Sequence, residues 1–177
     1  MKNPFILLTL GAAVLSLAAC STTEPKPARA VAKVQATSGS KVEGDLVFTQ
    51  KPGGKVVMST VISGLKPNSE HGFHIHELGN CADNGNAAGG HFNPKQGQHG
   101  KYDAPMHHMG DLPSLKADSN GVAKLNMESS DLTLLAGPGN IIGRAVIVHA
   151  NPDDYVTQPT GNAGGRIGCG VIVRDEQ

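Results

Sequence analysis

Histidines crowd one short stretch of this chain, and any fold for it must bring them into a common arrangement. Seven of the eight histidines lie between His71 and Asp111, in a segment rich in Gly and Asn. Packing gives no reason for such crowding, because histidine is only intermediate in its tendency to be buried. Neutral imidazole, in contrast, is the commonest metal ligand in proteins. The stretch therefore predicts a metal site, with the rest of the chain as its scaffold.

Apolar and polar residues alternate on both sides of this stretch, which is typical of strands with one buried face. Turn residues at 38–40 and 51–54 separate the first runs. The expected strands are 31–37, 42–50, 56–63, 70–77, 115–117, 122–127, 141–150 and 167–174. Short strands without a convincing helix predict an all-β sandwich or barrel. Only 132–135 could form a helical turn.

Two long loops interrupt the alternation, one at 78–111 and one at 151–165. A loop of this length inside a compact domain is uncommon unless it carries a function. The strand before the first loop places Phe73 and Ile75 on one face and His74 and His76 on the other, because strand side chains alternate. Two imidazoles on one rigid strand can converge on a single ion, although a pair like this could also face solvent.

The ligand types restrict the metal. Imidazoles with a single carboxylate suit zinc, copper, nickel or iron, whereas calcium and magnesium prefer oxygen. Three imidazoles and one carboxylate close a tetrahedral zinc shell, and the first loop offers such a set in His91, His99, His108 and Asp111. A third imidazole, His149, ends a later strand and could join His74 and His76. Those three imidazoles need a fourth nitrogen to complete a copper geometry; alternatively, His149 is an ordinary strand-end histidine.

The N-terminus predicts export. Lys2, an apolar run over 5–19 and then Cys20 have the order of a signal peptide. The residues Leu-Ala-Ala-Cys at 17–20 resemble a bacterial lipoprotein box, although an ordinary signal peptide is the alternative. The expected organisation is a signal peptide over 1–19, a flexible polar tether over 20–30 and one domain over 31–177. The mature protein is expected in the periplasm or cell envelope, held to a membrane by lipid on Cys20.

Charge and cysteines limit the remaining possibilities. The formal net charge is zero, which excludes the basic surface that nucleic acids require. If Cys20 carries lipid, Cys81 and Cys169 remain, and an oxidising compartment favours a disulfide between them. The alternative is that both cysteines bind metal as thiolates.

Five motifs together resemble the copper–zinc superoxide dismutases. They are GFHIHELG at 72–79, GHFNP at 90–94, HMGD at 108–111, VH at 148–149 and GNAGGRIGCG at 161–170, and the resemblance extends from about residue 31 to 173. It implies an eight-stranded Greek-key β-barrel in which the two long loops form the metal site. The second loop is similar to the bacterial periplasmic branch, whose subunit contact differs, so a homodimer and a monomer both stay open.

The resemblance also implies roles for single residues. One copper ion per subunit would be held by His74, His76, His91 and His149, and one zinc ion by His91, His99, His108 and Asp111. His91 would bridge the two ions, and Asp153 would link a copper-ligand imidazole to a zinc-ligand imidazole. Arg166 would sit over the copper and attract a small anion.

The implied activity is the disproportionation of superoxide to oxygen and hydrogen peroxide by copper redox cycling. In this scheme His91 and Arg166 are catalytic, zinc holds and tunes His91, and the enzyme protects the cell envelope. Two rivals are an inactive relative that stores copper or zinc and a purely structural zinc barrel. A complete copper ligand set together with Arg166 favours the enzyme, because a storage protein needs no anion guide.

Four other residues of the histidine-rich stretch have no assigned ligand role. His71 and His107 match no ligand position and are expected to be structural or surface residues. The sequence does not decide whether Lys95 and Lys101 help to steer substrate.

Overall fold

The computed structural model describes residues 26–176, so the predicted signal peptide and the lipidation site at Cys20 lie outside the described residues. Within them the chain forms nine strands and one short 3-10 helix, η1. In chain order these are β1 (Ala28–Ala36), β2 (Glu43–Gln50), β3 (Val56–Ser63), β4 (Glu70–His71), β5 (Phe73–His76), η1 (Asp83–Ala88), β6 (Leu115–Lys116), β7 (Ala123–Ser129), β8 (Ala145–His149) and β9 (Arg166–Arg174). No helix in this part of the chain has the length and apolar character needed to cross a bilayer.

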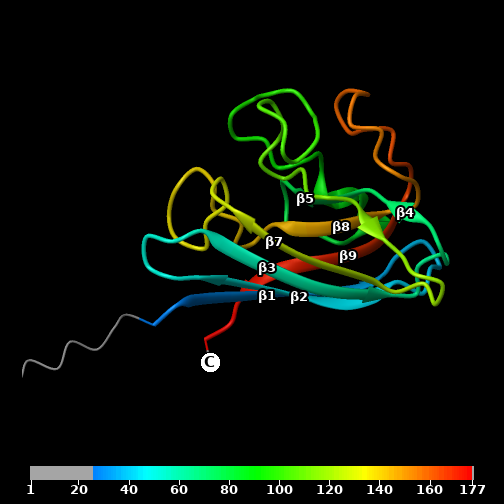
Figure 1. Cartoon of the computed structure of the whole chain (residues 1–177), viewed down its shortest axis with the longest axis horizontal. Helices are drawn as coiled ribbons and strands as arrows, with labels where there is room; N and C mark the ends of the chain where they lie inside the picture. The colour runs from blue at the N-terminus through cyan, green and yellow to red at the C-terminus, as the bar shows by residue number, and fades with distance from the viewer. Residues whose placement is uncertain (1–25, 177) are drawn as a thin grey trace, which may run out of the picture.

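The strands form a curled antiparallel sheet and a separate two-stranded pair (Figure 1). Seven of them hydrogen-bond in the order β5-β8-β9-β1-β2-β3-β7, and β4 pairs with β6. The two edges approach each other because β4 and β5 are separated only by Gly72, while a bridge between Ala117 and Ala123 joins the β6 end to β7. Non-consecutive neighbours such as β9-β1 and β3-β7 give the Greek-key order. The predicted all-β barrel is thus confirmed.

Several predicted element bounds were wrong. The expected strand at 70–77 breaks at Gly72, whose N–H donates to Asn151 of the second loop. The expected strand at 141–150 begins only at Ala145, because the preceding residues form a turn. β1 begins at Ala28, so the last three residues of the predicted tether pair with β2. Residues 132–135 form no helical turn, because Thr133 pairs with Asn140 in an isolated bridge and 134–135 are bends. The helix η1, in contrast, was not predicted.

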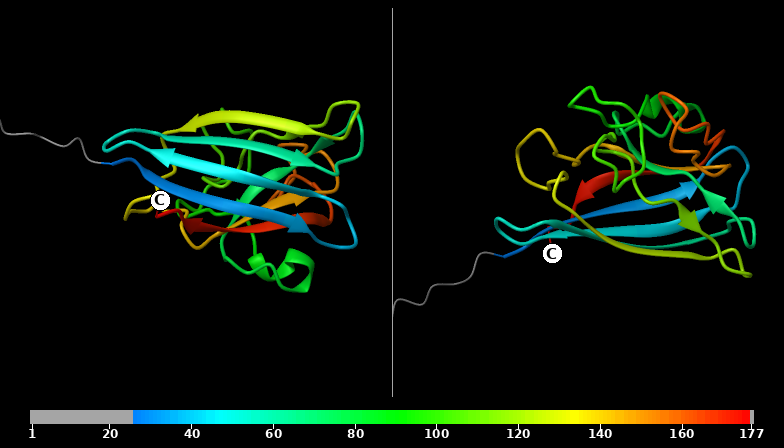
Figure 2. Two further views of the ribbon diagram at one scale, coloured as in Figure 1. Left: turned by 90° about the horizontal axis from the view of Figure 1, so that it is seen from below. Right: turned by 45° about the horizontal axis from the view of Figure 1, so that its top comes forward.

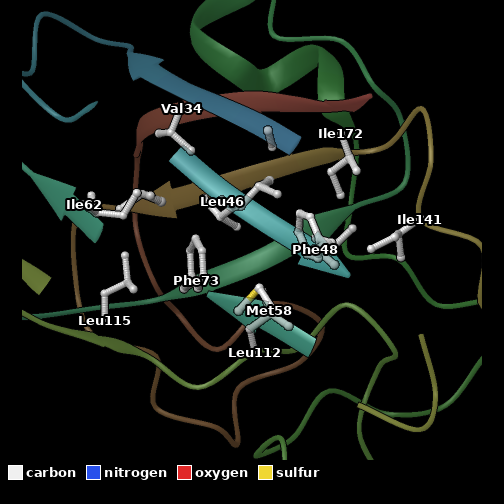
Figure 3. Packing of buried hydrophobic residues seen from close by; sticks show 14 of the residues in the cluster. Val34, Leu46, Phe48, Met58, Ile62, Phe73, Leu112, Leu115, Ile141 and Ile172 are labelled. Atoms are coloured by element: carbon white, nitrogen blue, oxygen red, sulfur yellow. The ribbon is translucent and has the colours of Figure 1, made fainter. Parts of the chain in front are cut away.

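The hydrophobic core fills the concave side of the sheet. β3 alternates buried and exposed residues along its length, as expected for a strand with one face in the core. Large buried side chains from different strands meet there, as Figure 3 shows for Leu46, Phe48, Met58 and Phe73. Leu112 and Leu115, which follow the first loop, belong to the same core. The core thus anchors the end of the loop that carries the histidines.

Both long loops lie on the same side of the sheet, next to β5 and β8 (Figures 1 and 2). A disulfide between Cys81 and Cys169 joins the start of the first loop to β9. Near the end of β5, the Arg144 guanidinium lies 3.6 Å from the centre of the Phe92 ring and pairs with Glu77 at 2.7 Å. These contacts tie the first part of the first loop to β9 and to the residue before β8.

Candidate metal centre

Two groups of buried ligand atoms lie side by side above β5. In each group the ligand atoms lie within 4.8 Å of one another. The tetrahistidine cluster consists of His74, His76, His91 and His149. The carboxylate cluster consists of His91, His99, His108 and Asp111. The structure therefore brings together every residue predicted as a metal ligand, and His91 belongs to both groups.

β5 is the platform for both clusters. Its core side carries Phe73 and Ile75, so His74 and His76 lie on the opposite side. One edge of β5 pairs with β8, which ends at His149. The second loop then begins immediately after this histidine.

The first loop returns twice to the other edge of β5. The N–H of Phe92 donates to the Ile75 carbonyl, and the N–H of Ile75 donates to the Gly110 carbonyl, both at 2.8 Å. These backbone bonds place His91 and Asp111 next to β5. Gly110 is required at this approach, because a Cβ there would lie 2.1 Å from the Ile75 carbonyl oxygen.

Most of the cluster histidines direct one ring nitrogen away from the centre. Nε2 of His74 and Nε2 of His99 donate to the two oxygens of Asp153, at 2.7 and 2.9 Å. Backbone carbonyls accept from the other three rings: Gly89 from His76 at 2.8 Å, Gly97 from His108 at 3.2 Å and Gly164 from His149 at 3.1 Å. Because a carbonyl or carboxylate oxygen can only accept, these bonds fix the tautomer of each ring in its neutral form, and the opposite nitrogen of that form carries a lone pair.

The remaining nitrogens fit bound cations. His74 Nδ1, His91 Nε2 and His108 Nδ1 are buried and have no hydrogen-bond partner in the described residues. His99 Nδ1 is buried as well and lies 3.0 Å from Asp111 Oδ1. His76 Nε2 and His149 Nε2 lie 3.4 Å apart, both free of carbonyl partners. Buried lone pairs without a donor are costly in a protein interior. Four imidazole nitrogens suit copper, and three imidazoles with a carboxylate suit zinc.

His91 presents a different nitrogen to each cluster. Its Nδ1 lies 2.8 Å from Asp111 Oδ1, whereas its Nε2 is one of the unpartnered nitrogens. The ring stacks on that of His74 with centroids 3.9 Å apart. One imidazole can therefore serve both groups of ligands at once.

Burial keeps the tetrahistidine rings neutral. Desolvation lowers the pKa of His74 to about 4 and that of His149 to about 3, and it holds the pKa of His76 well below its usual value. The rings are thus deprotonated at neutral pH, which is the state in which imidazole binds a metal.

In the carboxylate cluster, in contrast, neighbouring groups favour the charged forms of His99 and Asp111. Burial disfavours the charged form of His99, but the neighbouring carboxylates Asp111 and Asp153 outweigh burial and raise its pKa to about 9. Burial alone would raise the pKa of Asp111, yet hydrogen bonding to His91 and His99 lowers it, so the carboxylate is ionised. This cluster therefore favours a positive charge in its centre, which a divalent cation supplies.

Arg166 opens β9 next to the tetrahistidine cluster. Its guanidinium donates to the carbonyls of Gly85 and Gly89, both at 2.6 Å. The Gly89 carbonyl also accepts from His76, so Arg166 and His76 share one acceptor. η1, which contains Gly85, follows Cys81, and the disulfide holds it against β9. A partly exposed cation is thus fixed beside the histidines.

Residues without a predicted ligand role lie outside both clusters. His71 is buried, with Nδ1 donating to the His149 carbonyl at 2.8 Å, so it is structural. His107 donates to the Ala104 carbonyl at 2.8 Å. Lys95 lies 3.1 Å from Asp131 and Lys101 lies 3.4 Å from Asp103, so nearby carboxylates offset their positive charge.

Sequence reasoning missed two residues of the second loop. Gly161 approaches Asp153 so closely that a Cβ would lie 1.8 Å from its Oδ1, and its φ of +65° favours glycine. Gln158 hydrogen-bonds to the backbone of His99. The run of glycines after residue 160 was a signal for the first, whereas nothing near Gln158 in the sequence indicated the second.

Comparisons with known proteins agree with the ligand chemistry. Residues 42–172 match the family model for copper/zinc superoxide dismutase (SODC). A relative named Superoxide dismutase [Cu-Zn], from Paramecium bursaria Chlorella virus 1, is 42% identical over 173 residues, which cover 94% of this chain and 91% of the relative. A solved structure described as the clock protein EA4 is 39% identical and superposes with a TM-score of 0.74, covering 83% of this chain and 94% of that one. The chain therefore belongs to the copper/zinc superoxide dismutase family of oxidoreductases, and its two donor sets fit the copper and zinc cofactors of that family.

Proposed function

We propose that the protein disproportionates superoxide, with copper held by the tetrahistidine cluster and zinc by the carboxylate cluster. Two superoxide anions and two protons would yield one oxygen molecule and one hydrogen peroxide. The observation that carries this proposal is the position of His91, whose two ring nitrogens serve adjacent donor sets of different chemistry. One imidazole between two dissimilar ions is suited to coupling a redox centre to a structural one.

Bound copper would supply the redox centre, taking an electron from one superoxide and returning it to the next. The chain's own residues have separate tasks. His74, His76 and His149 stay neutral because they are buried, so they donate lone pairs over a wide pH range. Their outward nitrogens are held by Asp153 and by carbonyls, which fixes the ring orientations.

His91 would hold a proton and supply it to the product. Its Nε2 has no acceptor or donor in the described residues, so it can hold a proton there when it is not engaged as a ligand. Its Nδ1 remains directed to the carboxylate cluster, which prevents the ring from turning away. A proton held at Nε2 is then available to the peroxide product.

Arg166 would attract the substrate. The protein has no net charge to draw anions toward it, so the attraction must be local. The Arg166 guanidinium is pinned by two carbonyls of the first loop, on the same acceptor as His76. A fixed cation at the entrance raises the local concentration of a small anion.

We extend the proposal to the location of the protein. The signal-like N-terminus and Cys20 favour an exported lipoprotein of the bacterial periplasmic branch that protects the cell envelope. The Cys81–Cys169 disulfide supports export, because such bonds persist in oxidising compartments.

Replacement of Cys20 by Ser in the full chain should move the protein from the membrane fraction to the soluble fraction. Sedimentation of the metal-loaded protein would distinguish a homodimer from a monomer.

A single experiment separates the enzyme from its two rivals. The rate of superoxide loss is measured on purified protein together with copper and zinc content. Activity with one copper and one zinc per chain supports the enzyme. Bound copper without activity would indicate a storage protein, and zinc without copper would indicate a structural barrel.

The substitution His149→Ala tests which cluster carries the chemistry. His149 belongs only to the tetrahistidine cluster, so its loss should abolish turnover while zinc stays bound. Metal content before and after dialysis against a weak chelator checks this result. Equal loss of both metals would contradict the assignment of the two clusters.

A further inference from the structure

Gln158 makes an unusual contact across the two long loops. Its Oε1 accepts from the backbone N–H of His99 at 2.8 Å, and its Nε2 donates to the His99 carbonyl at 2.9 Å. One amide side chain therefore satisfies both backbone groups of a residue in the carboxylate cluster. Within the described residues, no backbone group pairs with either of them.

His99 needs such support because of where it lies. It belongs to the part of the first loop that has no regular secondary structure. His91 and Asp111, in contrast, lie beside β5 and are placed by backbone bonds to that strand. The position of His99 therefore depends on contacts from the second loop.

The second loop is itself built to present Gln158. The Asp154 carboxylate accepts from the N–H groups of Val156 and Thr157, at 3.0 and 2.8 Å, and from the Thr157 hydroxyl at 2.6 Å. The N–H of Asp154 donates to the Gly161 carbonyl at 2.9 Å, and that of Gly161 donates to the Thr157 carbonyl at 2.7 Å. These bonds close a compact turn around Gln158.

The same loop also holds the ring of His99. Asp153 Oδ1 accepts from His99 Nε2 at 2.9 Å, immediately before the turn. The ring is thus oriented by Asp153 and the backbone by Gln158, from two points of one segment. With both parts fixed, Nδ1 of His99 has little freedom to leave the carboxylate cluster.

We propose that Gln158 is a positioning residue that holds the backbone of His99 and so secures zinc in the carboxylate cluster. This inference rests on the proposed zinc assignment. Preorganised ligands bind metal more tightly, and loss of a group that orients a ligand typically lowers metal affinity by about 10–100-fold. Copper should be affected little, because His99 is not part of the tetrahistidine cluster.

The test compares Gln158→Met with Val156→Ala. Methionine keeps the length of the side chain but makes neither hydrogen bond. Val156 is 74% exposed on the same turn and serves as the matched control. Zinc and copper dissociation constants are measured by chelator competition on the metal-loaded protein. We expect Gln158→Met to weaken zinc at least about tenfold, with copper binding and the Val156→Ala variant unchanged.

Other results would overturn the proposal. A zinc dissociation constant unchanged in Gln158→Met would show that the amide stabilises folded protein equally with and without zinc. Equal weakening of zinc and copper, or the same loss in Val156→Ala, would show general loosening of the loop. A wild-type protein that holds no zinc would overturn the zinc assignment as well, which separates the two failures.

Discussion

At the scale of single residues, the ligands could be predicted and their supports could not. Histidine is distinctive enough that its spacing pointed to metal and to two sets of ligands, and the resemblance added His91 as the ligand that both sets share. The Gly89 carbonyl accepts from both His76 and Arg166. It is a backbone group, which every residue type has, so the sequence could not indicate this role. Gln158 escaped notice because its partner lies 59 residues away in a different loop.

Arg166→Ala tests the anion guide. Removal of the guanidinium should slow superoxide loss by about tenfold or more at low ionic strength, because steering by a fixed charge raises association rates by at least that factor. The rate should also lose most of its dependence on salt, while copper content stays the same. Pulse radiolysis over a series of salt concentrations measures both effects.

Lys95→Ala is the matched control for Arg166→Ala. Lys95 carries the same charge but lies 3.1 Å from Asp131, which offsets it. This variant should therefore change the rate only slightly. An unchanged rate in Arg166→Ala would remove that residue from the mechanism.

At the scale of elements, the alternation of apolar and polar residues predicted the regular strands well, but it gave no guide to the irregular segments. β3 was predicted with its observed bounds because buried and exposed residues alternate without interruption. η1 was missed because its sequence has no apolar period and its backbone is left-handed at Asn84 and Gly85, with φ of 51° and 82°. The break at Gly72 was missed because the competing partner, Asn151, comes from the second loop.

Loss of the disulfide should lower both the stability of the fold and the rate of superoxide loss. Cys81→Ala opens a loop whose ends are 88 residues apart, which the chain-entropy model puts at about 4–5 kcal/mol of unfolding free energy. η1 also loses its tie to β9, so the carbonyls that hold Arg166 gain freedom. We expect superoxide loss to slow at low salt even when copper is fully loaded.

Urea unfolding and salt-dependent kinetics on Cys81→Ala check these two effects separately. Wild-type protein treated with a reductant under native conditions should show the same slow rate. Lower stability with a normal rate would mean that the disulfide does not position the anion guide.

At the scale of the whole molecule, an all-β sandwich or barrel could be expected from the short alternating strands, but the path of the chain could not. The way in which β4 and β6 join the edges depends on contacts between segments far apart in sequence. The overall charge of zero spoke against a nucleic-acid surface, but it could not locate the charged groups of the site, because those charges are local.

The metal-free protein should be most stable near pH 6.5. The pKa values of His74 and His149, about 4 and 3, are lower folded than unfolded. Between those values and pH 6.5 the unfolded chain binds more protons, so stability falls as the solution is acidified. His99, with a pKa of about 9 when folded, binds its proton more tightly in the native state. Stability should therefore also fall as pH rises from 6.5 to 9.

Urea unfolding of metal-free protein at pH 4.5, 6.5 and 8.5 measures the free energy of unfolding on both sides of the maximum, which are the acid limb and the alkaline limb of the stability curve. Each group contributes at most about 1.4 kcal/mol per pH unit. The variant His99→Gln should flatten the alkaline limb and leave the acid limb in place. A stability that rises steadily to pH 9 in the wild type would contradict the raised pKa of His99. Zinc should remove the alkaline limb, because it replaces the proton.

β5 has consequences for how such a protein can change. Its odd and even positions have separate roles, since Phe73 and Ile75 pack in the barrel interior while His74 and His76 belong to the tetrahistidine cluster. Substitutions on one side can accumulate without disturbing the other, provided the backbone between them holds. A lineage could thus lose its metals and keep its architecture, or retune its chemistry on an unaltered frame.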